Sequence, residues 1–359
     1  MQILKKITDE FWWDVARTCD YATFYHTPIW REIAERAFRG HYQDETFGAI
    51  LPSGVRVVFP LFSKRQLGPI RWLESTFAGC YGGFIADGPV SPDEAASIYR
   101  HVLTWSTYSF YVFDNPLNLS ISDLKSKLNL VVSENAYAVS LDADFDTIFS
   151  RFSSSMRRNY RIGVKKGVQI RLAESVDDCR AYYASYRDAV DRWGEDESYG
   201  YSWEQFEQIY QLSLIYPENI KFWLMIVNDQ TVGGRIAFYW GQQVTQWNSS
   251  ALRDFLGYYV IPVADTEMIR DAITQGYRYF DFSTCNHKQS LIEYKERFAP
   301  IAVPLCGWLY ENPVITSLRA IHGRGRQALD SIRGTKTVPA PEPSDQSEIT
   351  QPNARAQDA

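Results

Sequence analysis

The chain has 359 residues, of which 45% are hydrophobic, so it is long enough to bury the core of one large domain or of two. Its net charge of −6 excludes a general attraction to nucleic acids or anionic membranes, and an anion site must therefore be built locally. Five widely spaced cysteines without a C-x-x-C pair are typical of reduced thiols in a cytoplasmic protein. The histidines lack metal-ligand spacing and no apolar run could span a membrane, so we expect neither a metal site nor a transmembrane segment.

Residues 1–145 are predicted to form a first α/β unit. Thr27 is the expected N-cap of a helix that begins at Pro28, because proline is favoured in the first helical turn. The paired Gly82 and Gly83 either permit a bend or let the backbone approach a ligand. The other expected elements are helices at 11–19 and 92–104 and strands at 46–50, 55–62 and 110–113.

Residues 146–311 are predicted to form a second unit, entered through a strand at 137–141. Gly233 and Gly234, inside the second of three consecutive strands, indicate either a bulge or a backbone left open to a ligand. The expected strands are 221–227, 231–240, 244–250, 277–282 and 302–310, and the expected helices are 144–152, 153–166, 176–193, 203–214 and 261–274. We expect a helix at 312–333 to pack back on the first unit, and the Pro-, Ser- and Gln-rich residues 334–359 to be disordered.

A basic segment stands out in this acidic chain, because residues 151–171 contain seven Lys and Arg and no acidic residue. If the segment is helical, Arg157, Arg161 and Lys165 share one face and Arg158 lies beside them. The face is either a clamp for a phosphate-bearing substrate or an ordinary solvated surface.

The most informative stretch is 276–300. Aromatic residues around Asp281 predict a short strand that ends in a polar loop, and a helix that contains Lys295 follows. Strand ends that face a crevice are where α/β proteins usually bind ligands. Asp281 either caps the next turn or acts in a site as a base or an orienting group. The apolar neighbours of Lys295 place it toward the buried side of its helix, where an ammonium group needs an anion or a wet cleft.

Two alternatives stay open in this stretch. Lys295 either meets the negative charge of a substrate or forms a structural salt bridge, for which Asp281 is the candidate partner. Cys285 in the loop is either a nucleophile or an incidental thiol, and no base of known position supports the first role.

In their order and spacing, these features resemble the FemAB-like proteins of the GNAT acyltransferase superfamily, and more closely their tRNA-independent, CelD-like branch found near exopolysaccharide genes. The resemblance covers residues 150–300 well, and Phe24 to Trp30 and Tyr81-Gly82-Gly83 extend it into the first unit. The motifs that carry it are Arg157-Arg158-Asn159-Tyr160-Arg161, Lys165-Lys166-Gly167-Val168, Val232-Gly233-Gly234-Arg235-Ile236-Ala237-Phe238, Gly276 with Phe280-Asp281-Phe282, and Tyr294-Lys295-Glu296-Arg297-Phe298.

The resemblance implies an α/β protein of two GNAT-like domains in tandem, 1–145 and 146–311, with a cleft between them. Such proteins transfer an acyl or aminoacyl group to an amine or a hydroxyl. The heptads of a coiled-coil arm are absent, as is the lysine that related aminoacyl transferases carry near the position of Ala34. Residues 253–258 are only a degraded form of the Q/R-x-x-G-x-G/A phosphate loop of ordinary GNAT enzymes.

We therefore expect an N- or O-acyltransferase of exopolysaccharide or cell-envelope metabolism, with no tightly bound cofactor, acyl-CoA as co-substrate, and a sugar or amine as acceptor. The alternatives are an aminoacyl-tRNA-dependent transferase, with tRNA as the less favoured partner, and a non-catalytic scaffold of a polysaccharide complex; no DNA partner is expected. The residues assigned under the resemblance are Lys295 and Asp281 for catalysis, Arg157, Arg158, Arg161, Tyr294 and His287 for the substrate, and Gly233, Gly234, Arg235 and Gly257 for the acyl-CoA.

Overall fold

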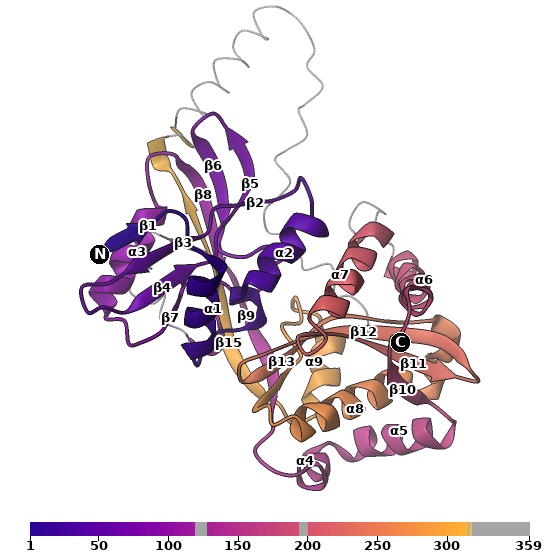
Figure 1. Cartoon of the computed structure of the whole chain (residues 1–359). Helices are drawn as coiled ribbons and strands as arrows, with labels where there is room; N and C mark the ends of the chain where they lie inside the picture. The colour runs from indigo at the N-terminus through magenta and orange to yellow at the C-terminus, as the bar shows by residue number, and fades with distance from the viewer. Residues whose placement is uncertain (119–127, 194–199, 315, 318–359) are drawn as a thin grey trace, which may run out of the picture.

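The computed structural model, shown in Figure 1, describes four stretches of the chain: 1–118, 128–193, 200–314 and 316–317. The predicted tail at 334–359, and all but the first residues of the helix predicted at 312–333, lie outside these stretches. In the part that is described, no helix is long and apolar enough to cross a membrane. Helices alternate with mixed sheets, which confirms the α/β class predicted from the sequence.

Strands dominate the architecture. Those in the described residues are β1 Gln2–Leu4, β2 Gln43–Asp44, β3 Phe47–Ile50, β4 Arg56–Phe59, β5 Phe62–Leu67, β6 Ile70–Glu74, β7 Ile85–Ala86, β8 Thr107–Phe113, β9 Asn129–Ser140, β10 Gln169–Leu172, β11 Ile220–Val227, β12 Gln230–Trp240, β13 Gln243–Ala251, β14 Tyr279–Asp281 and β15 Ile301–Glu311. A small antiparallel sheet has the order β1-β3-β4-β7, and a large mixed sheet has the order β10-β11-β12-β13-β14-β9-β15-β8-β6-β5-β2. In the large sheet, β13 with β14 and β6 with β8 are parallel pairs, and the other neighbours are antiparallel.

Helices cover both faces of the β10–β14 region (Figure 1). The described helices are α1 Asp9–Thr18, η1 Phe24–His26, α2 Pro28–Arg36, α3 Pro92–Val102, α4 Phe145–Arg151, α5 Ser154–Lys165, α6 Val176–Trp193, α7 Trp203–Ile215, η4 Arg253–Tyr258, α8 Val260–Thr274 and α9 Gln289–Glu296. α6 and α7 pack on one face, and α8 packs on the other with α5 behind it. Every residue of β11 is buried, as expected for a strand covered on both sides.

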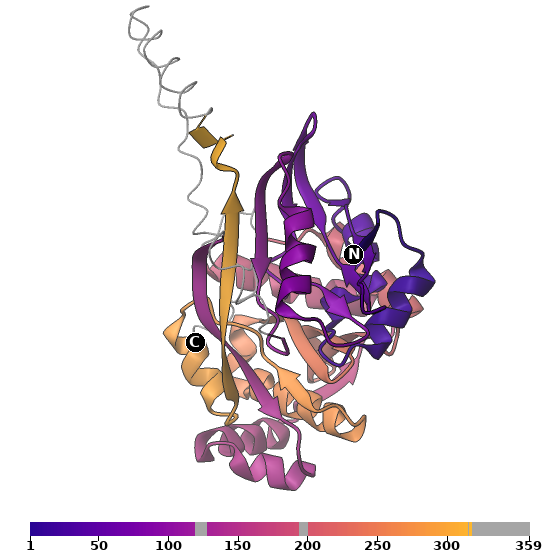
Figure 2. The same cartoon turned by 90° about the vertical axis from the view of Figure 1, so that its left-hand side faces the viewer.

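Strands β9 and β15 join the two halves of the chain. They pair antiparallel from Ile301–Ala138 to Leu309–Asn129, and run side by side along the molecule in Figure 2. β9 also pairs with β14 of the second half, and β15 also pairs with β8 of the first. The large sheet is therefore continuous across the boundary expected near residue 145, and the division into two GNAT-like domains stays a prediction.

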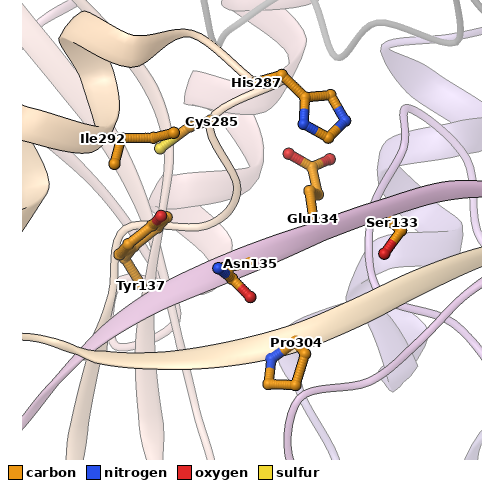
Figure 3. A pocket seen from close by; sticks show the side chains of 8 residues that line it. All are labelled: Ser133, Glu134, Asn135, Tyr137, Cys285, His287, Ile292 and Pro304. Carbon is orange, nitrogen blue, oxygen red and sulfur yellow. The ribbon is translucent and has the colours of Figure 1, made fainter.

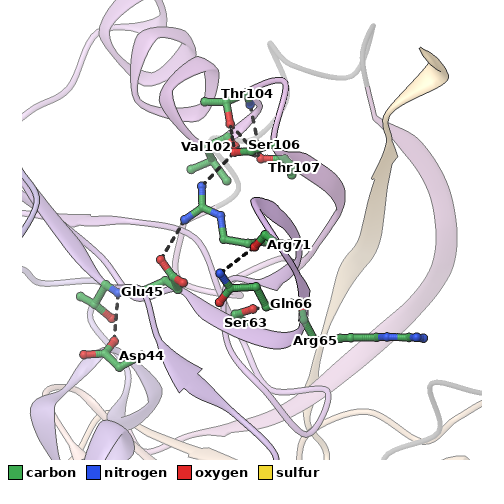
Figure 4. A network of polar contacts seen from close by, with 12 residues as sticks. Asp44, Glu45, Ser63, Arg65, Gln66, Arg71, Val102, Thr104, Ser106 and Thr107 are labelled. Atoms are coloured by element: carbon green, nitrogen blue, oxygen red, sulfur yellow. Dashed lines mark hydrogen bonds and ion pairs between the residues drawn. The ribbon is translucent and has the colours of Figure 1, made fainter. Parts of the chain in front are cut away.

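The hairpin of β5 and β6 was not expected from the sequence. The strand predicted at 55–62 is interrupted at Pro60, which has no N–H to donate to a ladder, and a new strand begins at Phe62. Arg71 holds the hairpin in place by donating to Glu45 at 2.8 Å and to the Ser106 hydroxyl at 3.3 Å (Figure 4).

Aromatic side chains fill the junction between the first half and β12. Phe24 stacks on Phe238 with ring centroids 4.2 Å apart, and Trp30 stacks on Phe77 at 4.4 Å. Such pairs add to the free energy gained by burying the rings alone.

The paired glycines of the first half permit a bend. Gly83 adopts φ +96°, which side chains rarely adopt, and a Cβ at Gly82 would lie 2.9 Å from Ser75. The bend is confirmed, and the close approach at Gly82 is to a neighbouring loop.

Candidate functional site

The short parallel pairing of β13 with β14 marks the centre of the candidate site. The last pair is Thr245 with Asp281, after which β14 stops while β13 continues to Ala251. From there on β13 keeps β12 as a partner but has none on the β14 side among the described strands. Open α/β sheets bind ligands at the carboxyl ends of strands, so a site is expected where these two strands separate.

Asp281 lies where β13 and β14 separate, and it is 1% exposed. Its Oδ1 accepts hydrogen bonds from the Tyr81 hydroxyl at 3.2 Å and from the Ser283 backbone N–H at 2.7 Å, while the buried Oδ2 has no hydrogen-bond partner. Burial raises the pKa of Asp281 to about 6, against the opposing effects of its hydrogen bonds and of Lys295. The predicted turn cap is therefore present, and one oxygen of the same carboxylate remains able to accept a proton.

Lys295 is 6% exposed, so its predicted burial is confirmed. Its ammonium group donates to the carbonyl oxygens of Phe282, Ser283 and Thr284 at 2.7, 3.3 and 2.7 Å. These bonds use all three donors of an ammonium group. The lysine therefore holds the loop after β14, in place of the expected alternative of a salt bridge with Asp281. Burial lowers the pKa of Lys295, an effect that the nearby thiol and carboxylates oppose.

A pocket of about 250 Å³ lies beside this loop (Figure 3). It is lined by Ser133, Glu134, Asn135, Tyr137, Cys285, His287, Ile292 and Pro304. Glu134 accepts the Asn286 N–H through Oε2 at 2.9 Å, and its carboxylate faces His287 in Figure 3. Asn286 and His287 have left-handed backbones, with φ of +46° and +57°, a conformation that is usually retained only at turns and functional sites. His287, which was predicted to bind the substrate, therefore lines this pocket.

Cys285 is 2% exposed and forms part of the wall of the pocket. Burial raises the pKa of its thiol, and Lys295 opposes this effect. A buried, protonated thiol is a poor nucleophile, which favours the interpretation of Cys285 as an incidental thiol. All five cysteines lie in the described residues, and none forms a disulfide.

Arg235, Asp265 and Tyr294 form a buried polar group between β12, α8 and α9. Arg235 and Asp265 are both 0% exposed and pair through Nε–Oδ1 and Nη2–Oδ2, each at 2.7 Å. The Tyr294 hydroxyl donates to Oδ2 at 2.6 Å. Burial raises the pKa of Asp265, although Arg235 and Tyr294 act to lower it. From the sequence, Arg235 was assigned to acyl-CoA and Tyr294 to the substrate. In the structure both contact the buried carboxylate of Asp265.

Gly233 and Gly234 lie in the middle of β12, between β11 and β13. A Cβ at Gly234 would lie 2.5 Å from the ring of Tyr182, and one at Gly233 would lie 2.7 Å from the Ser250 carbonyl oxygen. The expected bulge is confirmed beside them, where Val232 is left out of the pairing with β11. The open backbone expected as the alternative is not found, because both glycines are enclosed by neighbours.

The predicted basic helix is α5, and its N-cap is Ser153, whose hydroxyl accepts the Met156 N–H at 3.2 Å. Arg157 turns back to the end of α4, where it donates to the Ser150 carbonyl oxygen at 2.7 Å and also to that of Phe152. Arg157 therefore holds two helices together.

The other cations of α5 reach solvent. Arg158, Arg161 and Lys165 are exposed, with Arg161 lying 5.8 Å from the ring of Phe149. The structure thus separates Arg157, which has a structural role, from the exposed cations that could meet an anion.

The start of α8 is covered by α5. Gly257 lies in η4, and its carbonyl oxygen accepts from the Lys166 ammonium at 2.7 Å. A Cβ at Gly163 of α5 would lie 3.0 Å from the Tyr258 carbonyl oxygen and 2.5 Å from Val263. This contact brings the basic helix against the segment that resembles a degraded phosphate loop.

Three residues of the site were missed by sequence reasoning: Tyr81, Glu134 and Asp265. An acidic residue within the apolar run at the start of α8 is a signal that could have identified Asp265. Glu134 carries no such signal, and Tyr81 appears in the sequence only as part of a family motif without an assigned role; each reaches the site through long-range packing. Within the described residues, no group of three or more His, Cys, Asp or Glu is placed to hold a metal ion.

Comparison of the sequence with protein families finds that residues 150–296 match the acetyltransferase (GNAT) domain. No curated protein sequence matches the chain. The matched range runs from α4 to the end of α9, and it includes Asp281, Lys295 and the basic helix.

Solved structures share the fold over most of the chain. FemX matches with a TM-score of 0.67 and 10% identity, over 87% of this chain and 98% of that one. The C-terminal domain of a putative lysylphosphatidylglycerol synthetase from Agrobacterium fabrum matches with a TM-score of 0.56 and 13% identity, over 87% and 94%. A protein of unknown function from Bacteroides thetaiotaomicron matches with a TM-score of 0.55 and 12% identity, over 87% and 100%. Residues 150–296 thus match the acetyltransferase (GNAT) domain, and most of the chain shares the fold of FemX; both findings agree with the resemblance to FemAB-like proteins of the GNAT superfamily.

Proposed function

We propose that the chain is an acyltransferase that moves an acyl group from acyl-CoA to an amine or hydroxyl of a sugar or cell-envelope precursor. The observation that carries the proposal is Asp281, a buried carboxylate with a pKa of about 6 and one unpaired oxygen, where β13 and β14 separate. Its place inside a GNAT-type domain supports acyl transfer as the reaction. Five cysteines without a disulfide support a cytoplasmic setting.

Asp281 fits the role of general base. A carboxylate with a pKa of about 6 is ionised at neutral pH and is a stronger base than an ordinary aspartate. During transfer, the acceptor nitrogen or oxygen bonds to the acyl carbon and its proton passes to Oδ2. The C–S bond of the thioester then breaks, and the sulfur leaves as a thiolate that takes up a proton. Tyr81 and Ser283 keep Oδ1 in place throughout.

The edge of β13 beyond Thr245 is proposed to hold the acyl end of the donor, because among the described strands β13 has no neighbour on the β14 side from that point on. Lys295 is a positioning residue here, because it fixes the loop after Asp281 and its charge lowers the pKa of that carboxyl. The exposed Arg158 and Arg161 are proposed to contact the phosphates of CoA.

Aminoacyl transfer from a charged tRNA is the second candidate. The observation that favours it is the FemX fold, which covers 87% of this chain and 98% of that structure. The two candidates differ in their donor, since a tRNA enzyme should bind RNA with an affinity that falls steeply with salt. Binding titrations with bulk tRNA and with CoA, each at low and high salt, separate them.

The proposed function is tested by measuring CoA release from acetyl-CoA in the presence of small amines and sugars. The wild type should release CoA in an acceptor-dependent way, and Asp281→Asn should slow this at least about 100-fold, as expected for the loss of a general base. Asp93→Asn, an exposed carboxylate in α3 of the first half, serves as the control and should keep full activity. If CoA neither binds nor is released while tRNA binds tightly, the acyl-CoA proposal is wrong.

A further inference from the structure

We propose that the pocket around Glu134 binds the ammonium group of the acceptor, a small hydroxylated primary amine such as an amino sugar, and that a hydroxyl of the same molecule is the group that is acylated. The inference rests on the proposed function, because it names the acceptor of that reaction. The pocket is built from strands of both halves and from the loop that follows Asp281.

The chemistry of the lining favours a cation. Five of the eight lining side chains end in oxygen or imidazole nitrogen: Ser133, Glu134, Asn135, Tyr137 and His287. Glu134 adds a carboxylate, and neither Lys nor Arg is among the lining residues. A phosphate group would meet a carboxylate here without a cation to hold it, whereas a primary ammonium would find a counter-charge and several acceptors.

Glu134 is held so that one oxygen remains for a ligand. Its Oε2 accepts the Asn286 N–H at 2.9 Å, while Oε1 has no hydrogen-bond partner among the described residues. Lys295 interacts with the charge of Glu134 but directs its ammonium to the carbonyl oxygens of the loop. Among the described residues, Glu134 therefore forms no direct ion pair with this lysine.

The pocket is fixed in shape before any ligand binds. The left-handed backbones of Asn286 and His287 are held by the Glu134 bond and by the three Lys295 bonds to the preceding residues. Tyr137 contributes to the lining, and its backbone pairs with Phe282 at 2.8 Å and with Ser283 at 3.2 Å. The loop that follows Asp281 therefore forms one wall of the pocket.

The size of the pocket limits the ligand. Its volume of about 250 Å³ is below the roughly 300 Å³ at which pockets for drug-sized ligands begin. One sugar ring, or an amine of similar size, fits this description. Ile292 and Pro304 add an apolar side against which the carbon face of a ring can pack.

The test measures binding without an acyl donor, by calorimetry with glucosamine, glucose and glucose 6-phosphate as probes. Glucosamine should bind at least about tenfold more tightly than glucose, and glucose 6-phosphate should bind no better than glucose. Glu134→Gln keeps an oxygen for the Asn286 N–H and removes only the charge, so it should weaken glucosamine binding at least about tenfold and leave glucose unchanged. Glu293→Gln, an exposed carboxylate of α9, is the matched control and should bind as the wild type does.

Ser133→Phe is a second test variant. Ser133 is exposed and lines the pocket, so a phenyl ring at this position should fill the pocket without disturbing the core. This variant should fold normally and bind none of the probes. Equal binding of glucosamine and glucose, or wild-type glucosamine binding in Glu134→Gln or Ser133→Phe, would overturn the inference. Because no donor is present, glucosamine binding without later acyl transfer would count against the proposed function alone.

Discussion

Asp281 couples its ionisation to the stability of the protein. Because its pKa is raised to about 6, the folded protein holds a proton over a pH range in which the unfolded chain has already released it. The contribution of Asp281 to the free energy of unfolding should therefore fall as the pH rises from about 4 to about 7, and it should appear as the difference between the wild type and Asp281→Asn.

The same variant separates charge from hydrogen bonding. Its amide oxygen can still accept from Tyr81 and Ser283, so above pH 7 it should be more stable than the wild type by on the order of 2–3 kcal/mol. Urea unfolding of both proteins between pH 4 and pH 8 measures the difference. Parallel curves across that range would show that the folded-state pKa is not raised.

Lys295→Met should affect both folding and catalysis. Three carbonyl oxygens lose their donor, so the free energy of unfolding should fall by at least about 2 kcal/mol. Because the lysine charge lowers the pKa of Asp281, the midpoint of the pH–rate profile should move to higher pH in this variant. Lys165→Met, on the exposed face of α5, is the control and should change neither quantity. A loss of stability with an unmoved midpoint would limit Lys295 to a purely structural role.

The chemical character of single residues could be predicted better than their partners. The burial of Lys295 followed from the apolar residues around it on the helix, and Asp281 at the end of its strand followed from the aromatic pattern. The carbonyl ligands of Lys295 could not be predicted, because they depend on a left-handed Ser283, with φ of +61°, that no local pattern requires. The pairing of Arg235 with Asp265 joins separate elements and is equally invisible in the sequence.

At the scale of elements, α5 carries two kinds of arginine. Arg157→Gln should lower the melting temperature, because it removes the donor from two carbonyl oxygens at the end of α4. The double variant Arg158→Gln, Arg161→Gln should leave stability nearly unchanged and weaken CoA binding by about 1–3 kcal/mol for each charged hydrogen bond lost. Calorimetry with CoA and thermal unfolding of the same samples test both statements. Unchanged CoA affinity in the double variant would mean that this face is only solvated.

Elements with a strong local signal were predicted within a few residues. α6 occupies the predicted range 176–193, and β11, β12 and β13 begin within one residue of their predicted starts. The hairpin of β5 and β6 and the length of β9 were missed, because both follow from pairing with strands that are distant in the sequence. Hydrophobic periodicity in the sequence identifies a strand, but it does not show how far the neighbouring strand that pairs with it extends.

At the scale of the whole molecule, the α/β class with mixed sheets could be predicted, whereas the order of strands could not. The sequence placed a boundary near residue 145, but β9 and β15 carry the hydrogen bonding of the sheet across it. Topology depends on which strands meet in space, and neither turn signals nor composition record this for strands far apart in the chain.

The ladder of β9 and β15 also restricts how the protein can move. A hinge between the halves would have to break or bend a row of backbone hydrogen bonds that runs from Ile301 to Leu309. Hinge motions in proteins are usually absorbed by a few loop residues, and here the connection is a pair of long strands. We therefore expect the two halves to move little relative to each other, so that in the proposed reaction substrate entry and product release involve only local segments such as the loop between β14 and α9.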